Sequence, residues 1–249
     1  AQLLYTKLND GKWDEPKLIA EGNNWFLNWA DFPSIIENEG KVTAHWLQKS
    51  DVGTFDYDVR VAMTANKGQV WQNSFVPHED GIAAEHGFVS MLPLKNQRTF
   101  ITWLDGRNTK VEGESNGHSG GHGGGPMSLR AGIFDQNGNT IQEWELDNRV
   151  CDCCQTAAVE TAEGITVFYR DRSENEIRDI SVVRLKNNEW TEPTPLMVEL
   201  WEMPACPVNG PSASAQGDHL AVAWFMAKGG TPEVKLAFSE DGGASFGDP

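Results

Sequence analysis

The sequence predicts an all-β protein built from repeated four-stranded units, and two observations carry this prediction. Short runs of strand-forming residues that end in an aromatic residue recur along the chain, for example at residues 42–46 and 220–224. No long run has the period of an amphipathic helix. Units of roughly 45–70 residues suit the blades of a β-propeller, in which stacked sheets bury both faces of each blade. The expected fold is therefore a β-propeller of four-stranded blades.

Internal repeats divide the chain into these units. A Pro-Ser pair and a strand that ends in Trp occur at residues 33–46 and again, at one common offset, at residues 211–224. The strand and turn that follow, residues 59–71, align with residues 234–246 after a slightly shorter connection in the second copy. We expect a single domain over residues 1–249, with the end of a blade at 1–20, blades at 31–80, 85–146 and 151–199, and an incomplete blade at 206–249.

Each unit is expected to run as an inner strand, a second strand ending in an aromatic residue, a third strand, a polar turn and an outer strand. In the two central units the second strands are residues 99–103 and 165–169, and the third strands are residues 129–134 and 180–185. Tryptophans at the repeated positions are expected to fill the blade cores or to pack under turns. They are Trp13, Trp46, Trp71, Trp103, Trp190 and Trp224.

The first residues have the pattern of the end of a blade. Residues 4–13 match residues 182–190, which are the third strand and turn of a unit. We therefore expect the chain to begin in mid-blade and to hold about four blades plus half-blades. Because a closed propeller has no free edges, missing blades or a second chain are expected to complete the ring.

Residues 239–246 form a tight, glycine-rich turn between two expected strands, because Asp and paired Gly supply the turn conformations. The pattern Ser-x-Asp-x-Gly-x-Ser/Thr-Trp/Phe resembles the Asp-box, or BNR repeat, of the sialidase-like β-propellers. Its positions are filled by Ser239, Asp241, Gly243, Ser245 and Phe246. The resemblance covers all of the expected blades at the level of repeats, and it implies six blades in the complete ring.

Composition excludes some partners. The formal net charge of the 249 residues is −16, which argues against nucleic acid and against anionic membrane surfaces, since both need a basic patch. No apolar run is long enough to cross a bilayer, and no signal peptide is recognisable at the first residues. The chain opens directly on a strand, so we expect a mature periplasmic or extracellular product from which the signal peptide has been removed.

The repeat register places two sets of loops on one face, and these loops carry most of the unusual chemistry. They are the links from an outer strand to the next inner strand and the loops between second and third strands. Together they supply Asp31, Tyr57, Glu85, His86, Asp105, Arg107, His118, His122, four cysteines and residues 170–178. Carboxylates, guanidinium groups and aromatic rings at one end of a propeller axis indicate a pocket for a glycan or another small polar ligand.

The resemblance to sialidases implies particular roles for some of these residues. Sialidases hold a sugar carboxylate with three arginines, protonate with an aspartate and use a tyrosine activated by a glutamate. By this resemblance Asp31 is the expected acid, Glu85 the base, and Arg107, Arg170 and Arg178 the clamps. The family's N-terminal Arg-Ile-Pro strand is absent, and no Tyr falls in a late-blade loop, where the nucleophile is expected. Further ligand-binding candidates are Trp25, His86, Asp105, Arg172 and Trp201.

Structural roles are open for the same residues. Arg170, Arg172 and Arg178 can form ion pairs across a hairpin, which contribute little to stability when they are exposed. Asp31 and Glu85 can cap loop backbone, as acidic residues in turns often do. Trp25 and Trp201 can stack on a sugar or cover the core.

Four cysteines are the least ordinary feature of the chain. Cys151, Cys153 and Cys154 precede the inner strand of one blade and Cys206 precedes the next, so all four are expected to lie close together near the axis. Their even number in an acidic chain of expected exported type favours disulfides, including one between blades. The alternative is a soft-metal site for copper(I) or zinc. His118 and His122, in the glycine-rich loop 113–127, are candidate ligands of the same site.

Two classes of function follow. The first is an exported glycan-active protein, either an exo-acting glycoside hydrolase of sialidase type, which needs no cofactor, or an inactive binding relative. The second is a non-enzymatic protein whose Cys/His-rich face binds copper, zinc or a protein partner. Fold alone does not choose between them, because propellers carry many chemistries.

Overall fold

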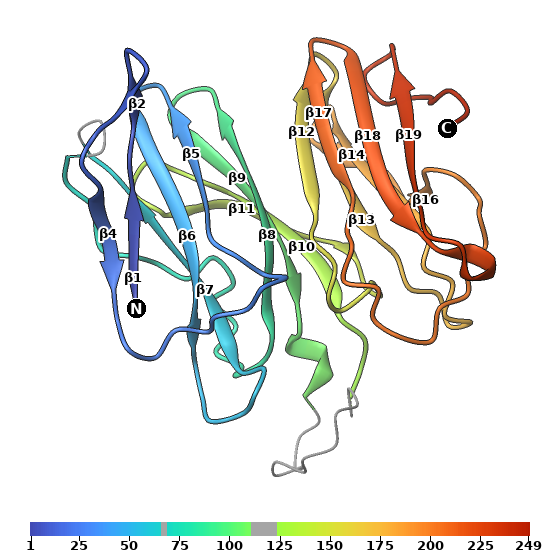
Figure 1. Ribbon diagram of the computed structural model, residues 1–249, viewed down its shortest axis with the longest axis horizontal. Helices are drawn as coiled ribbons and strands as arrows, with labels where there is room; N and C mark the ends of the chain where they lie inside the picture. Colours follow the sequence, from blue (N-terminus) through green and yellow to red (C-terminus); the bar gives the residue numbers. More distant parts are fainter. Residues whose placement is uncertain (66–68, 111–123) are drawn as a thin grey trace.

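The structure is a computed structural model, and it describes residues 1–65, 69–110 and 124–249. In this part of the chain the only helical segments are two short 3-10 turns, η1 (Arg107–Thr109) and η2 (Lys228–Gly230), and all other regular structure is antiparallel strand (Figure 1). The all-β prediction is confirmed. None of the described helices is long and apolar enough to span a membrane.

Four main sheets follow one another along the chain. The first contains β5 (Ser34–Asn38), β6 (Lys41–Lys49) and β7 (Tyr57–Met63). The second contains β8 (His86–Leu94), β9 (Arg98–Asp105), β10 (Ser128–Phe134) and β11 (Thr140–Asp147). The third contains β12 (Ala157–Thr161), β13 (Gly164–Arg170), β14 (Ile180–Lys186), β15 (Glu189–Trp190) and β16 (Thr194–Pro195). The fourth contains β17 (Ser212–Gln216), β18 (His219–Met226) and β19 (Glu233–Ser239).

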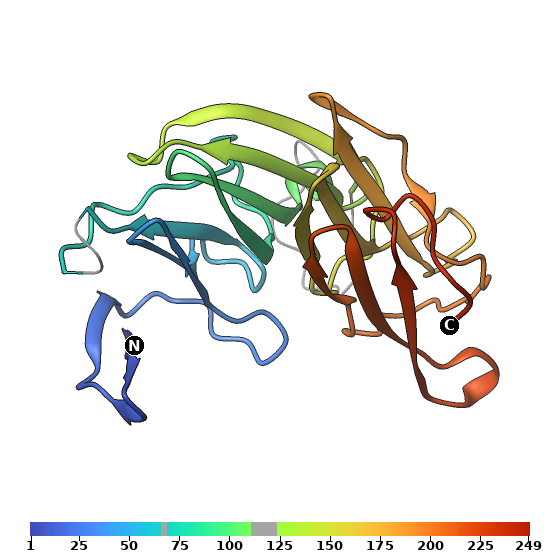
Figure 2. The same ribbon diagram turned by 90° about the horizontal axis from the view of Figure 1, so that it is seen from above.

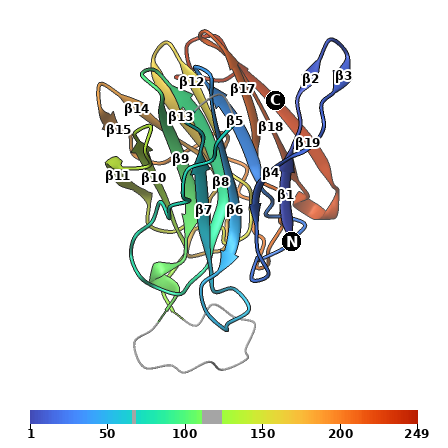
Figure 3. The same cartoon turned by 90° about the vertical axis from the view of Figure 1, so that its left-hand side faces the viewer.

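The N-terminal residues form a smaller element. Strand β1 (Gln2–Tyr5) pairs with β4 (Lys17–Glu21), and β2 (Leu8–Asn9) pairs with β3 (Lys12–Trp13) in a hairpin. Figure 3 shows this hairpin projecting away from the other sheets. The Trp13 side chain is 68% exposed, so the expectation that it packs in a blade core is wrong. The reason is that a two-stranded hairpin that projects in this way has no facing sheet to cover the ring.

The main sheets are arranged as blades around a common axis. Figure 2 shows them side by side in an open arc. Their first strands contact one another in sequence, β5 with β8, β8 with β12, and β12 with β17. This is the blade arrangement of a propeller, as predicted. An open arc by itself does not establish the expected need for missing blades or a second chain, which stays a prediction.

The core lies between neighbouring blades. Trp103, which is fully buried, packs between the first and second sheets, and Phe100 and Tyr169 pack between the second and third. Trp224 packs in the cluster between the third and fourth sheets. Burial of large side chains between the faces of adjacent sheets stabilises each blade through its neighbours.

The turn after β19 has the hydrogen bonds that its sequence predicts. Asp241 Oδ1 accepts from the Ser239 hydroxyl at 2.8 Å and from the Ser245 N–H at 2.9 Å. Gly242 and Gly243 have φ angles of 68° and 84°, a region that favours glycine. Phe246 then packs edge-on against Phe168, with ring centroids 6.0 Å apart.

Candidate functional site

The links into the first strands and the loops between second and third strands gather at one end of the blades, the lower end in Figure 1. We call this end the loop face, and its described parts are residues 22–33, 50–57, 76–86, 105–110, 124–127, 148–156, 171–179, 196–211 and 227–232. The turn at residues 239–246 lies at the opposite end (Figure 1). Most of the candidate residues therefore lie on one side of the molecule.

A buried phenol joins two carboxyl groups of the loop face. The Tyr57 hydroxyl donates to Glu85 Oε1 at 3.0 Å and lies 3.4 Å from Asp31 Oδ2. Asp31 and Tyr57 are 2% and 1% exposed, whereas Glu85 is half-buried. We call Asp31, Tyr57 and Glu85 the tyrosine cluster. Glu85 is the member of the cluster that is not fully buried.

Local backbone structure sets this geometry. Tyr57 is the first residue of β7, and its N–H donates to Ala84 O at 3.0 Å, which fixes it beside the segment that leads into β8. Asp31 Oδ2 accepts from the Phe88 N–H at 2.9 Å. A Cβ atom on Gly87 would lie 2.0 Å from Asp31 Oδ2 and 3.0 Å from the Tyr57 ring. Only glycine at position 87 therefore leaves room for the tyrosine cluster.

Burial changes the acidity of the tyrosine cluster. Burial raises the pKa of Asp31 to about 7, although hydrogen bonds from Phe88 and Tyr57 oppose the change. Burial also raises the pKa of Glu85 to about 8; the hydrogen bond from Tyr57 opposes the shift, and the charges of Asp152 and Asp31 add to it. Burial and the two neighbouring carboxyl groups raise the pKa of Tyr57 well above its usual value. At neutral pH the phenol is neutral and Glu85 carries a proton for most of the time.

A second group of charges surrounds His86, at the start of β8. His86 Nε2 lies 3.0 Å from Asp80 Oδ2 and 3.6 Å from Asp105 Oδ1, and the His78 ring stacks on it at 3.7 Å. Arg107 Nε donates to Asp105 Oδ1 at 2.8 Å. Burial alone would lower the pKa of His86, but its hydrogen bonds to Asp105 and Asp80 raise it to about 9. These expected ligand-binding residues are thus occupied by one another, and both His86 and Asp105 are fully buried.

A cavity of about 440 Å³ lies beside this group. Its lining consists of Ser50, Asp58, Val76, His78, Glu79, Asp80, Gly81, Ile82 and Ala83. This lining includes no member of the tyrosine cluster. The cavity therefore belongs to the surroundings of His86 rather than to Glu85.

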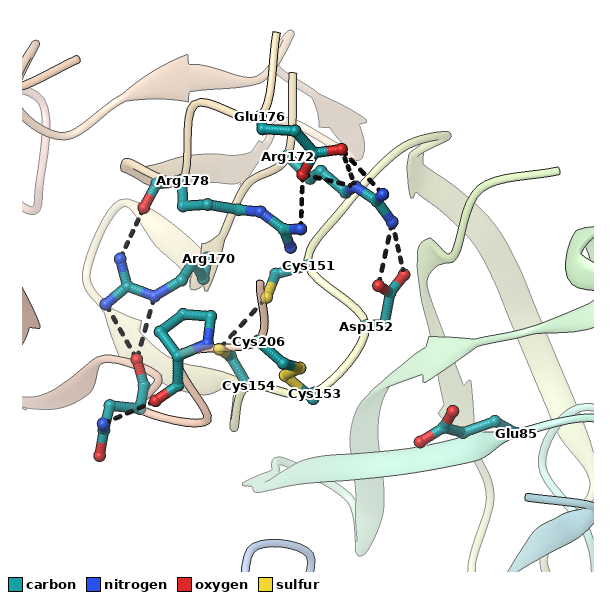
Figure 4. Close-up of a disulfide and its surroundings, with 12 residues drawn as sticks. Glu85, Cys151, Asp152, Cys153, Cys154, Arg170, Arg172, Glu176, Arg178 and Cys206 are labelled. Atoms are coloured by element: carbon teal, nitrogen blue, oxygen red, sulfur yellow. Dashed lines mark hydrogen bonds and ion pairs between the residues drawn. A yellow bond between two sulfur atoms is a disulfide. The ribbon is translucent and has the colours of Figure 1, made fainter. Parts of the chain in front are cut away.

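A chain of ion pairs faces Glu85 from the next blade. Arg172 Nη1 lies 3.0 Å from Asp152 Oδ2, and Arg172 Nη2 lies 2.8 Å from Glu176 Oε1. Arg178 Nη2 donates to Glu176 Oε2 at 2.7 Å. Figure 4 shows the Asp152 carboxyl group directed toward Arg172, with Glu85 on a neighbouring loop. Asp152 therefore lies between a guanidinium group and the acidic tyrosine cluster.

Arg170 and Trp201 lie in the interior. Arg170 is 1% exposed, and its guanidinium donates to Asn209 O, Arg178 O and Phe225 O at 2.6–3.0 Å. The same group lies over the Trp201 ring at 5.1 Å, and Trp201 is 3% exposed. Trp25 is half-buried and stacks on Trp46 at 5.8 Å. Arg170 thus holds loop backbone together, and it leaves no donor directed at the surface.

The four cysteines lie together, as Figure 4 shows. Cys153 and Cys206 form a disulfide that joins the link before β12 to the link before β17. Cys151 and Cys154 are buried thiols with their Sγ atoms 3.3 Å apart. The other candidate ligands, His118 and His122, lie outside the described residues. This disulfide joins two neighbouring blades, as expected from the positions of Cys153 and Cys206 before successive inner strands.

Comparison with known proteins supplies the fold. No protein-family model and no curated protein matches the sequence. A leech intramolecular trans-sialidase solved with 2,7-anhydro-Neu5Ac superimposes with a TM-score of 0.58 at 10% identity, over 88% of this chain and 50% of the other. A Hadza microbial sialidase superimposes with a TM-score of 0.55 at 11% identity, over 88% of this chain and 46% of the other. The chain has a sialidase-like β-propeller fold.

A third similar structure extends the likeness beyond sialidases. An α-L-arabinanase of Penicillium chrysogenum, solved with arabinobiose, superimposes on this chain with a TM-score of 0.52 at 14% identity, over 98% of this chain and 68% of the arabinanase. The chain spans about half the length of the two sialidase-type proteins. At these identities the likeness concerns the fold and not the residues of the site.

Sequence reasoning did not assign a site role to Tyr57 or Asp152. From the sequence alone, Tyr57 belongs to the loop-face residues but has no expected role, because it does not lie in a late-blade loop of the propeller. The signal that was available is local: Tyr57 begins a third strand on the same face as Asp31 and Glu85, and Gly87 follows Glu85 closely. Asp152 lies between two cysteines, which drew the interpretation toward the sulfur atoms.

Proposed function

We propose that the protein is a glycoside hydrolase that binds a glycan on its loop face and uses Glu85 as the proton donor. The observation that carries this proposal is the environment of Glu85. It is half-buried on the loop face, is held by the Tyr57 hydroxyl at 3.0 Å, and has a pKa raised by burial to about 8. A carboxyl group that stays protonated at neutral pH is suited to protonate a glycosidic oxygen.

Hydrolysis of a glycoside needs a second carboxyl group in a different environment. Asp152 is the candidate, because it is ion-paired with Arg172 at 3.0 Å and its charge is one of the causes that raise the pKa of Glu85. In this proposal Glu85 gives a proton to the leaving oxygen, while Asp152, which is 4% exposed, orients the attacking group together with its ion-pair partner Arg172. Glu85 and Asp152 take different roles because burial keeps the proton on Glu85, whereas Asp152 is ion-paired with Arg172.

Asp31 and Tyr57 act through Glu85 in this proposal. The resemblance to sialidases implies Asp31 as the acid and Glu85 as the base, but Asp31 is 2% exposed and is bonded to the Phe88 N–H. Asp31 Oδ2 also lies 3.4 Å from the Tyr57 hydroxyl, so this carboxyl group holds two neighbouring groups in place. We therefore assign Asp31 and Tyr57 as positioning residues, with Glu85 as the residue that contacts the substrate.

The charge of the site favours a neutral glycan over a sialoside. The Asp152 carboxylate and the ionised fraction of Asp31 repel a sugar carboxylate, whereas the protonated Glu85 does not. The arginines expected to contact a ligand, Arg107, Arg170, Arg172 and Arg178, each donate to carboxylate or carbonyl oxygens of the chain itself. An open clamp of three arginines is thus not preformed. The arabinobiose-bound arabinanase among the similar structures is consistent with a neutral substrate.

Location outside the cytoplasm is part of the proposal. The Cys153–Cys206 disulfide supports it, because disulfides persist in oxidising compartments. The acidic composition is compatible with such a location and with a polar, uncharged ligand.

The test is hydrolysis of a panel of fluorogenic glycosides by the purified protein, including an α-L-arabinofuranoside and an α-sialoside. Turnover of a neutral glycoside that is lost in Glu85→Gln supports the proposal. Glu240→Gln is the matched control, because Glu240 is exposed in the turn at the opposite end of the blades. Turnover of the sialoside alone would favour the sialidase-type activity that the resemblance implies. Glycan binding without turnover would favour a binding relative, and full activity in Glu85→Gln would overturn the assignment of the proton donor.

A further inference from the structure

The four sulfur atoms form one compact group that the proposed glycosidase activity does not use. The Cys153–Cys206 disulfide lies at the surface, since Cys206 is exposed and Cys153 is half-buried. Cys151 Sγ lies within 4.8 Å of both sulfur atoms of this disulfide. It also lies 3.3 Å from Cys154 Sγ. A buried pair of thiols is thus in contact range of an accessible disulfide (Figure 4).

Positive charge surrounds the buried thiols. Figure 4 shows the Arg178 guanidinium extending toward Cys151. Arg178 is 3% exposed, and its Nε and Nη1 atoms have no hydrogen-bond acceptor, while Nη2 is bonded to Glu176. Burial and the neighbouring Cys151 raise the pKa of Cys154 well above its usual value, and the charges of Arg170 and Arg178 oppose this shift. A buried guanidinium group with unused donors favours a negatively charged sulfur beside it, and the thiolate is the nucleophilic form of cysteine.

We propose that the four cysteines form a single thiol–disulfide exchange unit, in which the disulfide moves between Cys153–Cys206 at the surface and Cys151–Cys154 in the interior. In the first step the Cys151 thiolate attacks Cys206 Sγ; the Cys151–Cys206 bond forms, the Cys153–Cys206 bond breaks, and Cys153 leaves as a thiolate. In the second step Cys154 loses its proton and attacks Cys151 Sγ, the Cys151–Cys154 bond forms, and Cys206 leaves as a thiolate.

The exchange is balanced within the chain. Two thiols and one disulfide are present before and after, and the protons lost by Cys151 and Cys154 pass to Cys153 and Cys206. No oxidant or reductant is consumed. The partner class that can use the product is a disulfide in solution, because the exchange leaves the thiols of Cys153 and Cys206, which reduce that disulfide to two thiols as the Cys153–Cys206 bond forms again; Cys206 is exposed.

The exchange also changes a connection between blades. In one form a covalent bond links the segment before β12 to the segment before β17, and in the other form this bond is absent. The inference does not depend on the proposed glycosidase activity. It rests only on the positions of the four sulfur atoms and of Arg178.

The experiment is alkylation of the native wild-type protein with iodoacetamide over time, followed by denaturation, blocking of the remaining thiols with N-ethylmaleimide, reduction and a third, isotopically distinct label. Tandem mass spectrometry then assigns one of the three labels to each cysteine. We expect native labelling of Cys206 and Cys153 to accumulate together with a Cys151–Cys154 disulfide. The wild-type protein is sufficient to decide the question, because iodoacetamide traps the exchanged form. A result in which Cys151 and Cys154 remain the free thiols at all times, with Cys153 and Cys206 always disulfide-bonded, would overturn the proposal.

Two matched variants separate the steps. Cys151→Ser removes the first nucleophile, so native labelling of Cys206 should fall at least about tenfold. Cys154→Ser leaves the first step intact, so a Cys151–Cys206 disulfide with labelled Cys153 should accumulate. Equal labelling of Cys206 in wild type and in a folded Cys151→Ser protein would contradict the mechanism. Circular dichroism of each variant establishes that it is folded.

Discussion

The Tyr57 hydroxyl lies 3.0 Å from Glu85 Oε1 and donates a hydrogen bond to it from a position beneath the loop face. The phenol ring is itself fixed by Phe26, which stacks on it at a centroid distance of 4.0 Å and an interplanar angle of 9°. This arrangement gives Glu85 one orientation although its side chain is half-buried. The rigidity of a catalytic carboxyl group depends on such supporting contacts.

Tyr57→Phe tests this support. The phenylalanine ring keeps the contact with Phe26 but loses the hydrogen bonds to Glu85 and Asp31, so we expect hydrolytic activity to fall roughly 10–100-fold. The free energy of unfolding should fall by about 1–2 kcal/mol, because Glu85 and the buried Asp31 lose the hydroxyl group that they share as a hydrogen-bond partner. Glycoside kinetics and urea denaturation measure the two effects.

Tyr169→Phe is the matched control for this variant. Tyr169 also donates from a buried phenol to a carboxylate, Asp147 Oδ2 at 2.6 Å, but it lies outside the tyrosine cluster. It should lose similar stability without the loss of activity. Equal activity losses in Tyr57→Phe and Tyr169→Phe would mean that the effect is structural.

The dependence of stability on pH tests the protonation of Glu85. The pKa of Glu85 is about 8 in the folded protein, against an ordinary value of 4.5. The folded protein therefore keeps a proton that the unfolded chain releases, and the stability from this group is complete below the ordinary pKa and is lost as pH rises through 8. Asp31, raised to about 7, contributes with the same sign.

We expect the free energy of unfolding of the wild-type protein to fall between about pH 5 and about pH 8, and to fall less in Glu85→Gln, because glutamine does not titrate. Urea denaturation at the two pH values measures the difference. The prediction fails if the decrease has the same size in both proteins. Glu240→Gln, at an exposed position, should behave like the wild type.

Gly87→Ala tests how closely the backbone approaches the tyrosine cluster. The added methyl group would lie 2.0 Å from Asp31 Oδ2, so either the carboxyl group or the β8 backbone has to move. We expect a loss of about 2–3 kcal/mol in the free energy of unfolding, together with a loss of activity. Gly247→Ala is the control, since its nearest neighbour would be Phe238 O at 3.9 Å and little effect is expected. A fully stable and active Gly87→Ala protein would show that the space around Asp31 is not limiting.

The fold could be predicted further than the site. The recurrence of Trp46 and Trp224 at one offset reports a repeated core position, and both side chains are buried between β-strands. Repeats reveal the fold because each blade needs the same kind of core side chain at the same position. The site has no such repetition, since each loop of the propeller contributes a different residue.

Arg170 shows why site residues are harder to predict. Its donors are satisfied by carbonyl groups of Asn209 and Phe225, which are 39 and 55 residues away in the sequence. A guanidinium group buried by distant backbone looks, in the sequence, like one that is free to bind a ligand. Tyr57 is the opposite case, because its partners Asp31 and Glu85 become neighbours only when the links of two blades meet.

Asp152→Asn distinguishes a catalytic pair from two independent carboxyl groups. Asp152 and Asp31 both raise the pKa of Glu85 through their charge, so removal of the Asp152 charge should lower it. In the pH profile of kcat/KM for a glycoside, the alkaline limb that reports loss of the Glu85 proton should therefore move to lower pH. The same variant removes the second carboxylate of the proposed pair, so kcat should also fall roughly 10–100-fold.

Asp10→Asn, on the exposed turn between β2 and β3, should change neither the pH profile nor kcat. A fall in kcat with no movement of the alkaline limb would indicate that Asp152 acts at a distance from Glu85, and an unchanged kcat would remove Asp152 from the mechanism.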